Sequence, residues 1–274
     1  MLESCLLKIR RAAWKGLMYV DFFAKSELEK VVAEYPKVLS LEDTLDRLVA
    51  GESICRFGDG EFSIILGRKQ HFQNHSGQLA FRLSEVLSSP EEKNLLIAIP
   101  SLELDRETTR EKEKGRKYRF WSRFWMRSWR FLKDYFTQSE YGNAFVSRLN
   151  VFQEVPLDKI KAIWENRDVV FIVPPNGRFK FDDRLFGNIK SAEFVDVPPV
   201  DAFEHYDEIL DETLKRDKDK LYYIAAGPTA TVLAYDLYRS GRQALDLGHL
   251  TNCYLEFLGV GKRPELLPTA IKSE

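Results

Sequence analysis

The alternation of short apolar runs with longer amphipathic segments is the feature of this sequence that most restricts its fold. Strands are predicted at 53–58, 94–100, 144–150, 168–175, 192–199, 221–227 and 243–248. Helices are predicted between them at 41–50, 77–89, 157–166, 203–216 and 229–240. Several of the strands are almost continuously apolar, as expected for strands that are covered on both faces. The pattern therefore predicts an α/β fold with a mainly parallel sheet flanked by helices.

Composition narrows the class of protein further. The 274 residues are 44% hydrophobic and 30% charged, which is enough apolar material for a sizeable core. The formal net charge of −1 disfavours a nucleic-acid-binding protein, which would carry an excess of positive charge. Cys5, Cys55 and Cys253 form neither a disulfide framework nor a zinc motif. No uninterrupted apolar run reaches the length of a signal peptide or a membrane span, so we expect a cytoplasmic protein.

The residues that follow the predicted strands are the first place to look for a site. In open α/β sheets, ligands bind at the carboxyl ends of the strands. These residues are Gly58 to Glu61, Pro100, Ser101, Arg148, Asn150, Pro174 to Arg178, Pro198, Pro199, Gly227 to Thr229 and Asp246 to His249. The set is rich in glycine, acids and hydroxyls, which indicates a functional site at this edge of the sheet.

An acidic turn follows the first of these predicted strands. Asp59 and Glu61 alternate with Gly58 and Gly60, and in an extended or turning backbone residues two apart project to the same side. Paired carboxylates are hard oxygen ligands for Mg²⁺ or Mn²⁺, and such an ion neutralises a diphosphate leaving group. The alternative is a polar turn in which Asp59 caps its own backbone. The spacing alone leaves both interpretations open.

A second turn, at Gly227 to Thr231, precedes a predicted helix. Gly227 permits a tight turn and Pro228 suits the first position of a helix. Thr229 and Thr231 would then lie beside free backbone N–H groups at the positive end of the helix dipole, where anions are favoured. The alternative is that Thr229 only caps the helix.

Three further residues are candidates for a general base that activates an acceptor hydroxyl. Asp246 and His249 lie at the end of the last predicted strand, and Glu256 follows them. A histidine at such a position is also often a hydrogen-bonded structural residue. The place of His249 at the same sheet edge as Asp59 supports the catalytic interpretation enough to leave both interpretations open.

Three segments together resemble one family. RFGDGEF, AAGPTATVLAYDL and ALDLGH are similar, in this order, to segments of the GT-D-type glycosyltransferases, a bacterial family formerly catalogued as a domain of unknown function. Weaker similarity lies in YGNAFVSR and PPVDAFEHYDEIL, and the resemblance extends from about residue 40 to about residue 258. GPTATVLAYDL is the most specific segment.

The resemblance implies a Rossmann-like, GT-D-like domain and a metal-dependent transfer of a sugar, glucose or a related one, from a UDP-sugar. It implies a DxE metal motif at Asp59 and Glu61 that binds Mn²⁺ or Mg²⁺. The acceptor would be a glycan, a glycoprotein or a lipid-linked molecule in protein or cell-surface glycan assembly. The cofactor- and donor-binding residues that it implies are Arg56, Gly58, Gly60, Gly227, Thr229, Thr231 and Gly248, with Asp246, His249 and Glu256 as catalytic candidates.

The sequence departs from the family pattern in two places. After the Gly-His pair the family commonly has an acidic stretch similar to IDIEYEW, whereas this chain has LTNCYLEF, with Thr251, Cys253 and Leu255 where acids are expected. The second departure is the segment PPNGRFKFDDRLFGN at 174–188, where an acidic-glycine-arginine loop is more usual in the family. The alternative function is therefore a catalytically impaired nucleotide-sugar-binding or scaffold protein of the same fold.

Two segments lie outside this pattern. Residues 1–38 are predicted to be an amphipathic helical extension to a domain at 39–274. Residues 110–133 are predicted to be a basic aromatic helical insertion, in which Trp121, Trp125 and Trp129 recur every four residues. Such a helix could contact the inner face of an anionic membrane, or its tryptophans could be core or subunit contacts. Assembly into a homo-oligomer stays open.

Overall fold

The computed structural model describes residues 30–68, 73–74, 76–102, 124–125, 127–268 and 270. The chain divides into two compact units, one of residues 1–35 and 102–134 and one of residues 36–101 and 135–274. The sheet and all the candidate site residues belong to the second unit, so the fold is described there first.

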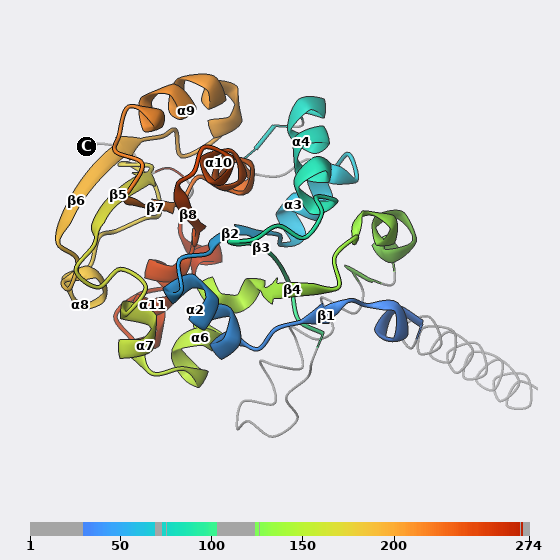
Figure 1. The fold of residues 1–274 in the computed structure, drawn as a ribbon, viewed down its shortest axis with the longest axis horizontal. Helices are drawn as coiled ribbons and strands as arrows, with labels where there is room; N and C mark the ends of the chain where they lie inside the picture. The colour runs from blue at the N-terminus through green and yellow to red at the C-terminus, as the bar shows by residue number, and fades with distance from the viewer. Residues whose placement is uncertain are drawn as a thin grey trace, which may run out of the picture. The chain divides into compact units, whose positions relative to one another are not determined.

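An eight-stranded sheet forms the centre of the second unit (Figure 1), in the order β1-β4-β3-β2-β8-β7-β5-β6. Every neighbouring pair is parallel. The strands are β1 (Lys37–Val38), β2 (Ser53–Arg56), β3 (Leu95–Ile99), β4 (Glu140–Asn143), β5 (Asp168–Val173), β6 (Ser191–Asp196), β7 (Leu221–Ile224) and β8 (Gln243–Asp246). The predicted α/β fold with a mainly parallel sheet is confirmed.

Helices cover both faces of this sheet. Their bounds are α2 (Leu41–Val49), α3 (Asp59–Ile65), α4 (Gly77–Leu87), α6 (Leu149–Glu154), α7 (Leu157–Lys161), α8 (Asp183–Phe186), α9 (Tyr206–Leu214), α10 (Pro228–Arg239) and α11 (Leu250–Phe257). Short 3₁₀ turns are η2 (Ala144–Ser147), η3 (Ala202–His205) and η4 (Pro264–Leu266). In Figure 1, α3, α4, α9 and α10 lie on one face of the sheet, and α2, α6, α7 and α11 lie on the other.

Local sequence explains where several helices begin. Ser40 and Ser76 cap α2 and α4, since each hydroxyl accepts a hydrogen bond from a backbone N–H in the first turn. Asp182 caps α8 in the same way. Pro228 occupies the first turn of α10, where its missing N–H costs no hydrogen bond.

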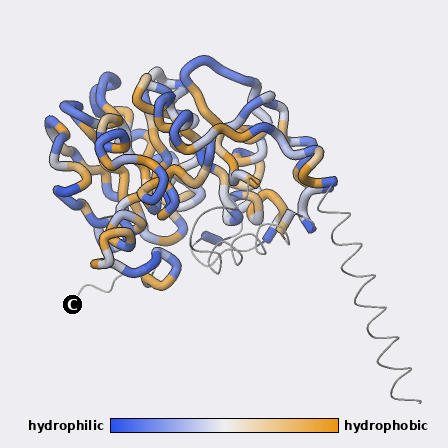
Figure 2. Tube along the Cα trace, turned by 90° about the horizontal axis from the view of Figure 1, so that it is seen from below, coloured by the Kyte–Doolittle hydropathy of each residue, from blue (hydrophilic) through white to orange (hydrophobic). Residues whose placement is uncertain are grey.

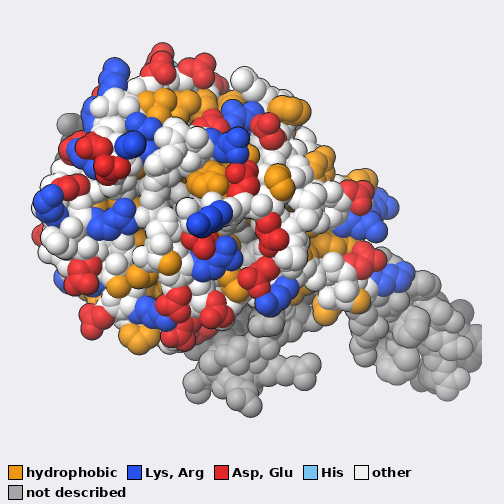
Figure 3. Space-filling view, viewed as in Figure 1, with side chains coloured by type: hydrophobic (Ala, Val, Ile, Leu, Met, Phe, Trp, Pro, Cys, Tyr) orange, Lys and Arg blue, Asp and Glu red, His pale blue; other side chains and the backbone are white. Residues whose placement is uncertain are grey.

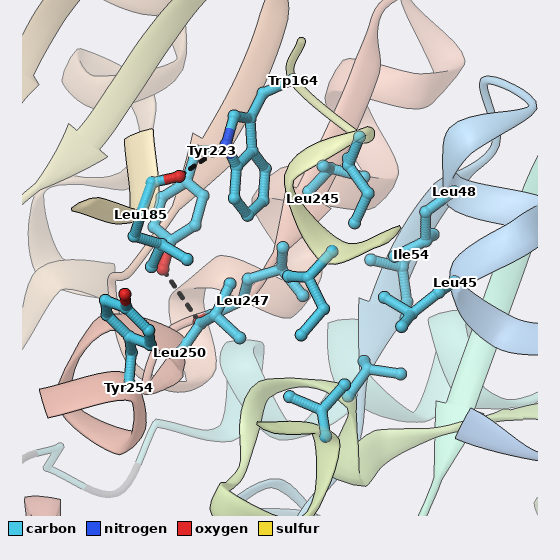
Figure 4. Close-up of a cluster of buried hydrophobic side chains, with 14 of the residues drawn as sticks. Leu45, Leu48, Ile54, Trp164, Leu185, Tyr223, Leu245, Leu247, Leu250 and Tyr254 are labelled. Carbon is cyan, nitrogen blue, oxygen red and sulfur yellow. Dashed lines mark hydrogen bonds between the residues drawn. The ribbon is translucent and has the colours of Figure 1, made fainter. Parts of the chain in front are cut away.

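One cluster of buried hydrophobic side chains lies between the sheet and the helices of the α2/α11 face. Figure 4 shows part of it, in which Trp164 donates to the carbonyl of Leu185 at 3.0 Å and Tyr223 donates to the carbonyl of Leu247 at 3.1 Å. These two bonds satisfy the polar atoms of large buried rings, which would otherwise cost free energy. Figure 2 shows hydrophobic segments in the interior and hydrophilic ones toward the outer helices and loops.

The predicted strand at 144–150 is wrong. Strand β4 ends earlier, at Asn143, whose side chain accepts a hydrogen bond from the N–H of Phe145 at 3.0 Å. This bond turns the chain into η2, and α6 begins after Arg148. Ala144 and Val146 are buried, and Phe145 and Leu149 are partly buried, as part of 3₁₀ and helical turns. The apolar pattern of the segment therefore reflects packing of these turns and not a strand.

Several short elements were not predicted at all. These are β1, α3, α6, α8 and α11. The other predicted strands and helices are present, with ends that shift by a few residues: the first predicted strand ends at Arg56, for example, and the helix predicted to begin at 229 begins at Pro228.

In the first unit, residues 124–125 and 127–132 are helical. Trp125 and Trp129 are buried at 0% and 7% exposure, and both rings pack against Tyr35. Trp129 also donates to Glu34 at 2.8 Å. These two tryptophans therefore serve as core contacts and do not form an exposed face. Trp121 and the rest of 110–123, and also residues 1–29, lie outside the described residues. Among the helices that are described, none combines the length and the apolar composition needed to cross a bilayer.

Candidate active site

The two central strands, β2 and β8, bring Arg56 and Asp246 together at the carboxyl edge of the sheet. The Asp246 carboxylate accepts from the backbone N–H of Arg56 at 3.2 Å and lies 3.4 Å from its Nη2. Arg56 Nε also donates to the Asp246 carbonyl at 3.1 Å. The Thr231 hydroxyl, from α10, lies 2.9 Å from the Arg56 carbonyl and 3.1 Å from Asp246 Oδ2. These contacts join two strands and one helix at a single point.

Asp246 is 2% exposed, and burial raises the pKa of its carboxyl, while Arg56 and Thr231 act in the opposite direction. The raised pKa makes Asp246 more basic than a surface aspartate. Its hydrogen bonds also hold Arg56 in place. The prediction that Asp246 is the base is compatible with this environment and stays a prediction.

The acidic pair lies at the start of a helix and not on an extended turn as expected. Gly58 is the N-cap of α3, Asp59 is the first helical residue and Gly60 is buried within the first turn. Glu61 turns back, and its Oε2 accepts from the Gly58 N–H at 2.7 Å. On a helix, residues two apart point in different directions, so the two carboxylates do not project side by side from the backbone. The assumed extended geometry is therefore wrong, whereas both residues do lie at the end of β2.

The environment of Glu61 carries excess negative charge. Burial raises the pKa of the Glu61 carboxyl to about 7, and the charge of Asp246 acts in the same direction against the partial relief from Arg56. In the described part of the chain, no cluster of three or more metal-ligating side chains is present. Asp59 and Glu61 carry hard oxygen ligands of the kind that a divalent ion binds. A positive ion would offset the negative charge of Glu61 and Asp246. Because the two carboxylates leave α3 in different directions, a shared ion at this pair stays a prediction.

The turn before α10 gives its two threonines different roles. Gly227 has φ 58° and ψ −144°, a conformation suited to glycine, and it is the N-cap of α10. Thr229 therefore does not cap the helix, and its fully buried hydroxyl has no hydrogen-bond partner among the described residues. Thr231 is also fully buried, but its hydroxyl contacts Arg56 and Asp246. Of these two threonines, only Thr229 has a hydroxyl without a hydrogen-bond partner among the described residues.

His249 lies at the start of α11 among positive charges. Burial and the arginines at 148, 56 and 178 hold the pKa of His249 well below its usual value, so the imidazole is neutral. Its Nδ1 is buried and has no hydrogen-bond partner in the described residues. At neighbouring Gly248, an added Cβ would lie 3.6 Å from Arg56 Nη2. This distance is an ordinary van der Waals contact, so the space beside the Arg56 guanidinium does not require glycine at this position.

Glu256 is not at this edge. It lies in the last turn of α11, and its carboxylate pairs with Arg263 Nε at 3.2 Å. Seven residues of helix separate it from His249, which corresponds to about 10 Å along the helix axis. In the same helix Thr251 and Cys253 are 1% and 2% exposed. Their side chains face the interior, so acids at these two positions would have to be buried.

Sequence reasoning included Arg148 and Arg178 in the set of residues near strand ends but gave neither a role. The structure places them near His249, and Arg148 Nη1 pairs with Glu265 at 2.7 Å. Their position after strands was a usable signal. Nothing in the sequence indicated that η4, at the far end of the chain, would reach the same edge.

Comparison with known proteins agrees with this architecture. Residues 54–267 match the family described as "Glycosyltransferase GT-D fold". The chain is 28% identical over 249 residues to the glycosyltransferase GlyD of Streptococcus pneumoniae serotype 4, covering 88% of this chain and 30% of that protein. It is 29% identical over 227 residues to the probable glycosyl transferase Gly of Streptococcus gordonii, covering 79% and 32%. The chain thus spans about a third of the length of these curated relatives.

Solved structures show the same fold. One, of the domain of unknown function 1792 and described as a distinct glycosyltransferase fold, superposes with a TM-score of 0.78 at 27% identity and covers 88% of this chain and 87% of its own. A second, described as a new glycosyltransferase from Streptococcus sanguinis, gives a TM-score of 0.74 at 26% identity, with 82% and 86% covered. The family resemblance seen in the sequence is confirmed. The chain belongs to the family of glycosyltransferases with the GT-D fold.

Proposed function

We propose that this chain is a metal-dependent glycosyltransferase that moves a sugar, with glucose as the first candidate, from a UDP-sugar to an acceptor hydroxyl in protein or cell-surface glycan assembly. The observation that carries the proposal is the group of buried charges where β2 and β8 end. Glu61 and Asp246 flank Arg56 there, in a chain of glycosyltransferase family. A diphosphate-linked sugar with a divalent ion is a ligand that such a mixed set of charges can hold.

The donor would lie between α3 and the start of α10. Asp59 and Glu61 would hold Mn²⁺ or Mg²⁺, which, when bound, neutralises charge on the leaving diphosphate. The N–H groups that follow Gly227 favour an anion, and the Thr229 hydroxyl supplies a donor that has no partner within the described protein. Arg56 is held in orientation by Asp246.

The acceptor hydroxyl needs a group that takes its proton. Asp246 supports this role because burial raises its pKa, and neutral His249 supports it as an uncharged hydrogen-bonding partner. Glu256 is the weaker candidate because of its distance along α11 and its pairing with Arg263.

Release of UDP from a UDP-sugar, with and without Mn²⁺, tests the proposal. Asp59→Asn is expected to abolish the metal-dependent release. Asp183→Asn is the matched control, because Asp183 is likewise the first residue of a helix, α8, but follows β5 and not the central strand β2. Metal-independent release, or equal activity of the two variants, would contradict the assignment.

The alternative is a protein that binds a nucleotide sugar without transferring it. The segment LTNCYLEF, which lacks the expected acids, favours it. Binding of UDP-sugar in calorimetry without UDP release for any acceptor would select this alternative.

Location and partners follow from the same proposal. We propose a cytoplasmic protein that acts on a glycan, glycoprotein or lipid-linked acceptor. Membrane contact through 110–133 is not supported by Trp125 and Trp129, which are buried, and vesicle sedimentation tests it for the rest of the segment. Light scattering tests whether the protein forms a homo-oligomer. On the face shown in Figure 3, basic and acidic side chains are interspersed over the surface.

A further inference from the structure

The segment after α11 returns to the carboxyl edge of the sheet. Within and beside η4, Glu265 and Leu267 each contact an arginine that follows a strand. Glu265 Oε1 lies 2.7 Å from Arg148 Nη1, and the Leu267 carbonyl accepts from Arg178 Nη2 at 2.9 Å. Residues more than eighty positions apart in sequence are thus held together at this edge.

Arg148 and Arg178 are fixed in place by the elements that carry them. Arg148 is the residue at which η2 ends and α6 begins. The backbone carbonyl of Arg178 accepts from Asn252 Nδ2 of α11 at 2.9 Å. Both guanidinium groups act on His249 and lower its pKa, which places their charges close to the end of β8.

The charges of these arginines are incompletely balanced. Arg56 faces Asp246. Among the described residues Arg148 pairs only with Glu265, whose side chain is 62% exposed. Within the described residues Arg178 has no carboxylate at ion-pair distance, and its buried Nε has no acceptor. Two guanidinium groups therefore share one exposed carboxylate and one carbonyl.

We propose that Arg148 and Arg178, beside His249, form a binding subsite for a phosphate group of a substrate, and that Glu265 is an internal ligand which this phosphate displaces. The guanidinium group binds phosphate through two parallel N–H bonds, and a phosphate offers more charge and more acceptor atoms than one carboxylate. An ion pair as exposed as Arg148–Glu265 contributes little to stability, so its displacement costs little.

The subsite deepens the proposed function and rests on it for the nature of the substrate. Two substrates of a glycosyl transfer can present this chemistry: the diphosphate of the nucleotide-sugar donor and the phosphate of a phosphorylated acceptor. Displacement of Glu265 would also release η4 from the site, so substrate binding and the position of the segment after α11 would be coupled.

The test is calorimetry on the whole chain with Mn²⁺, using UDP, uridine, and decyl phosphate in the presence of saturating UDP. Glu265→Gln removes the internal competitor and is expected to tighten phosphate binding about two- to fivefold, the size of a surface ion pair. Arg148→Gln and Arg178→Gln are expected to weaken it about tenfold or more. Glu42→Gln is the matched control, since Glu42 pairs with Lys159 at 2.8 Å and is 65% exposed.

The pattern of affinities separates the two sources. If UDP binding responds to the three variants and uridine binding does not, the subsite takes the donor diphosphate. If only decyl phosphate responds, it takes an acceptor phosphate. Unchanged affinity for both anions in folded Glu265→Gln and arginine variants would overturn the proposal, as would a failure of the wild-type chain to bind either anion. If an arginine variant does not fold, the phosphate affinities of Glu265→Gln and Glu42→Gln are compared, and equal affinities would overturn the proposal. If the variants change the affinities as expected but the protein transfers no sugar, the proposed function is refuted and the subsite is retained.

Discussion

The two buried threonines of α10 allow a paired test of the site. Thr229 and Thr231 are both fully buried, two residues apart, and valine has nearly the shape of threonine without the hydroxyl. Thr231→Val removes a donor that lies 3.1 Å from the Asp246 carboxylate. Because a hydrogen bond to a charged group contributes about 1.5–3 kcal/mol, we expect a loss of that size in the free energy of unfolding. Thr229→Val breaks no bond to a described residue, so its change is expected within about 0.5 kcal/mol or stabilising.

The pH dependence of the Thr231→Val loss follows from Asp246. The hydrogen bond from Thr231 lowers the pKa of Asp246, whereas burial raises it, so the variant would raise this pKa further. The hydrogen bond from the Thr231 hydroxyl stabilises ionised Asp246 more than it stabilises protonated Asp246. The loss is therefore expected in full at pH values above the folded-state pKa of Asp246 and is expected to shrink as the pH falls through it.

Chemical denaturation at pH 8 and pH 5, with wild type and both variants, measures these differences. For a chain of this size, about 2 kcal/mol corresponds to a fall in Tm of roughly 4–8 °C. UDP titration then measures donor binding in the two variants. Only Thr229→Val is expected to weaken the binding of UDP, by about 1–3 kcal/mol, without a loss of stability. Equal losses of stability for the two variants, or a Thr231→Val deficit that grows toward low pH, would refute this reasoning.

Three further outcomes are expected. Asp59→Asn should leave the Tm of the metal-free protein unchanged and should abolish the increase in UDP affinity that Mn²⁺ gives, as measured by calorimetry. If the variant keeps this response to Mn²⁺, Asp59 is not part of the metal site. Gly227→Ala should cost about 1–3 kcal/mol in unfolding free energy because of the backbone conformation at this position, and a neutral effect would contradict the observed φ and ψ. Asp246→Asn should lower turnover about 100-fold or more with little change in donor affinity, whereas wild-type turnover together with an inactive Glu256→Gln would assign the base to α11.

The central strands were predictable because their composition matches their environment. Leu95–Ile99 and Asp168–Val173 are buried on both faces and consist of almost nothing but apolar residues. Strand β4 was missed because its sequence, EYGN, is unlike a buried strand. An added Cβ on Gly142 would lie 2.6 Å from Leu96 Cδ2, so glycine is needed there for close packing against β3. Amino-acid composition therefore indicates well which strands are buried, but it indicates poorly where two strands pack so closely that glycine is needed.

The candidate site was predictable in position more than in geometry. Following the predicted strand ends brought Asp59, Glu61, Asp246 and His249 to one edge, and the family resemblance added Arg56. In the structure Arg56 contacts Asp246, and its charge acts on both Glu61 and His249. The short helix that carries the acidic pair was missed because glycines usually indicate a turn, and here Gly58 caps a helix that contains Gly60. No local pattern could show which of two neighbouring threonines has a partner.

The pairing of β2 with β8 has a consequence for how the chain folds. Arg56 and Asp246, which meet at the ends of these strands, are 190 residues apart. Closing so long a loop costs entropy before the contacts are gained, and proteins rich in distant contacts fold slowly. During synthesis, one edge of β2 remains without its partner strand until β8 has been made. A ribosome-bound chain that ends before Gln243 should therefore expose the edge of β2 at Ile54, the residue that pairs with Leu245 in the finished sheet.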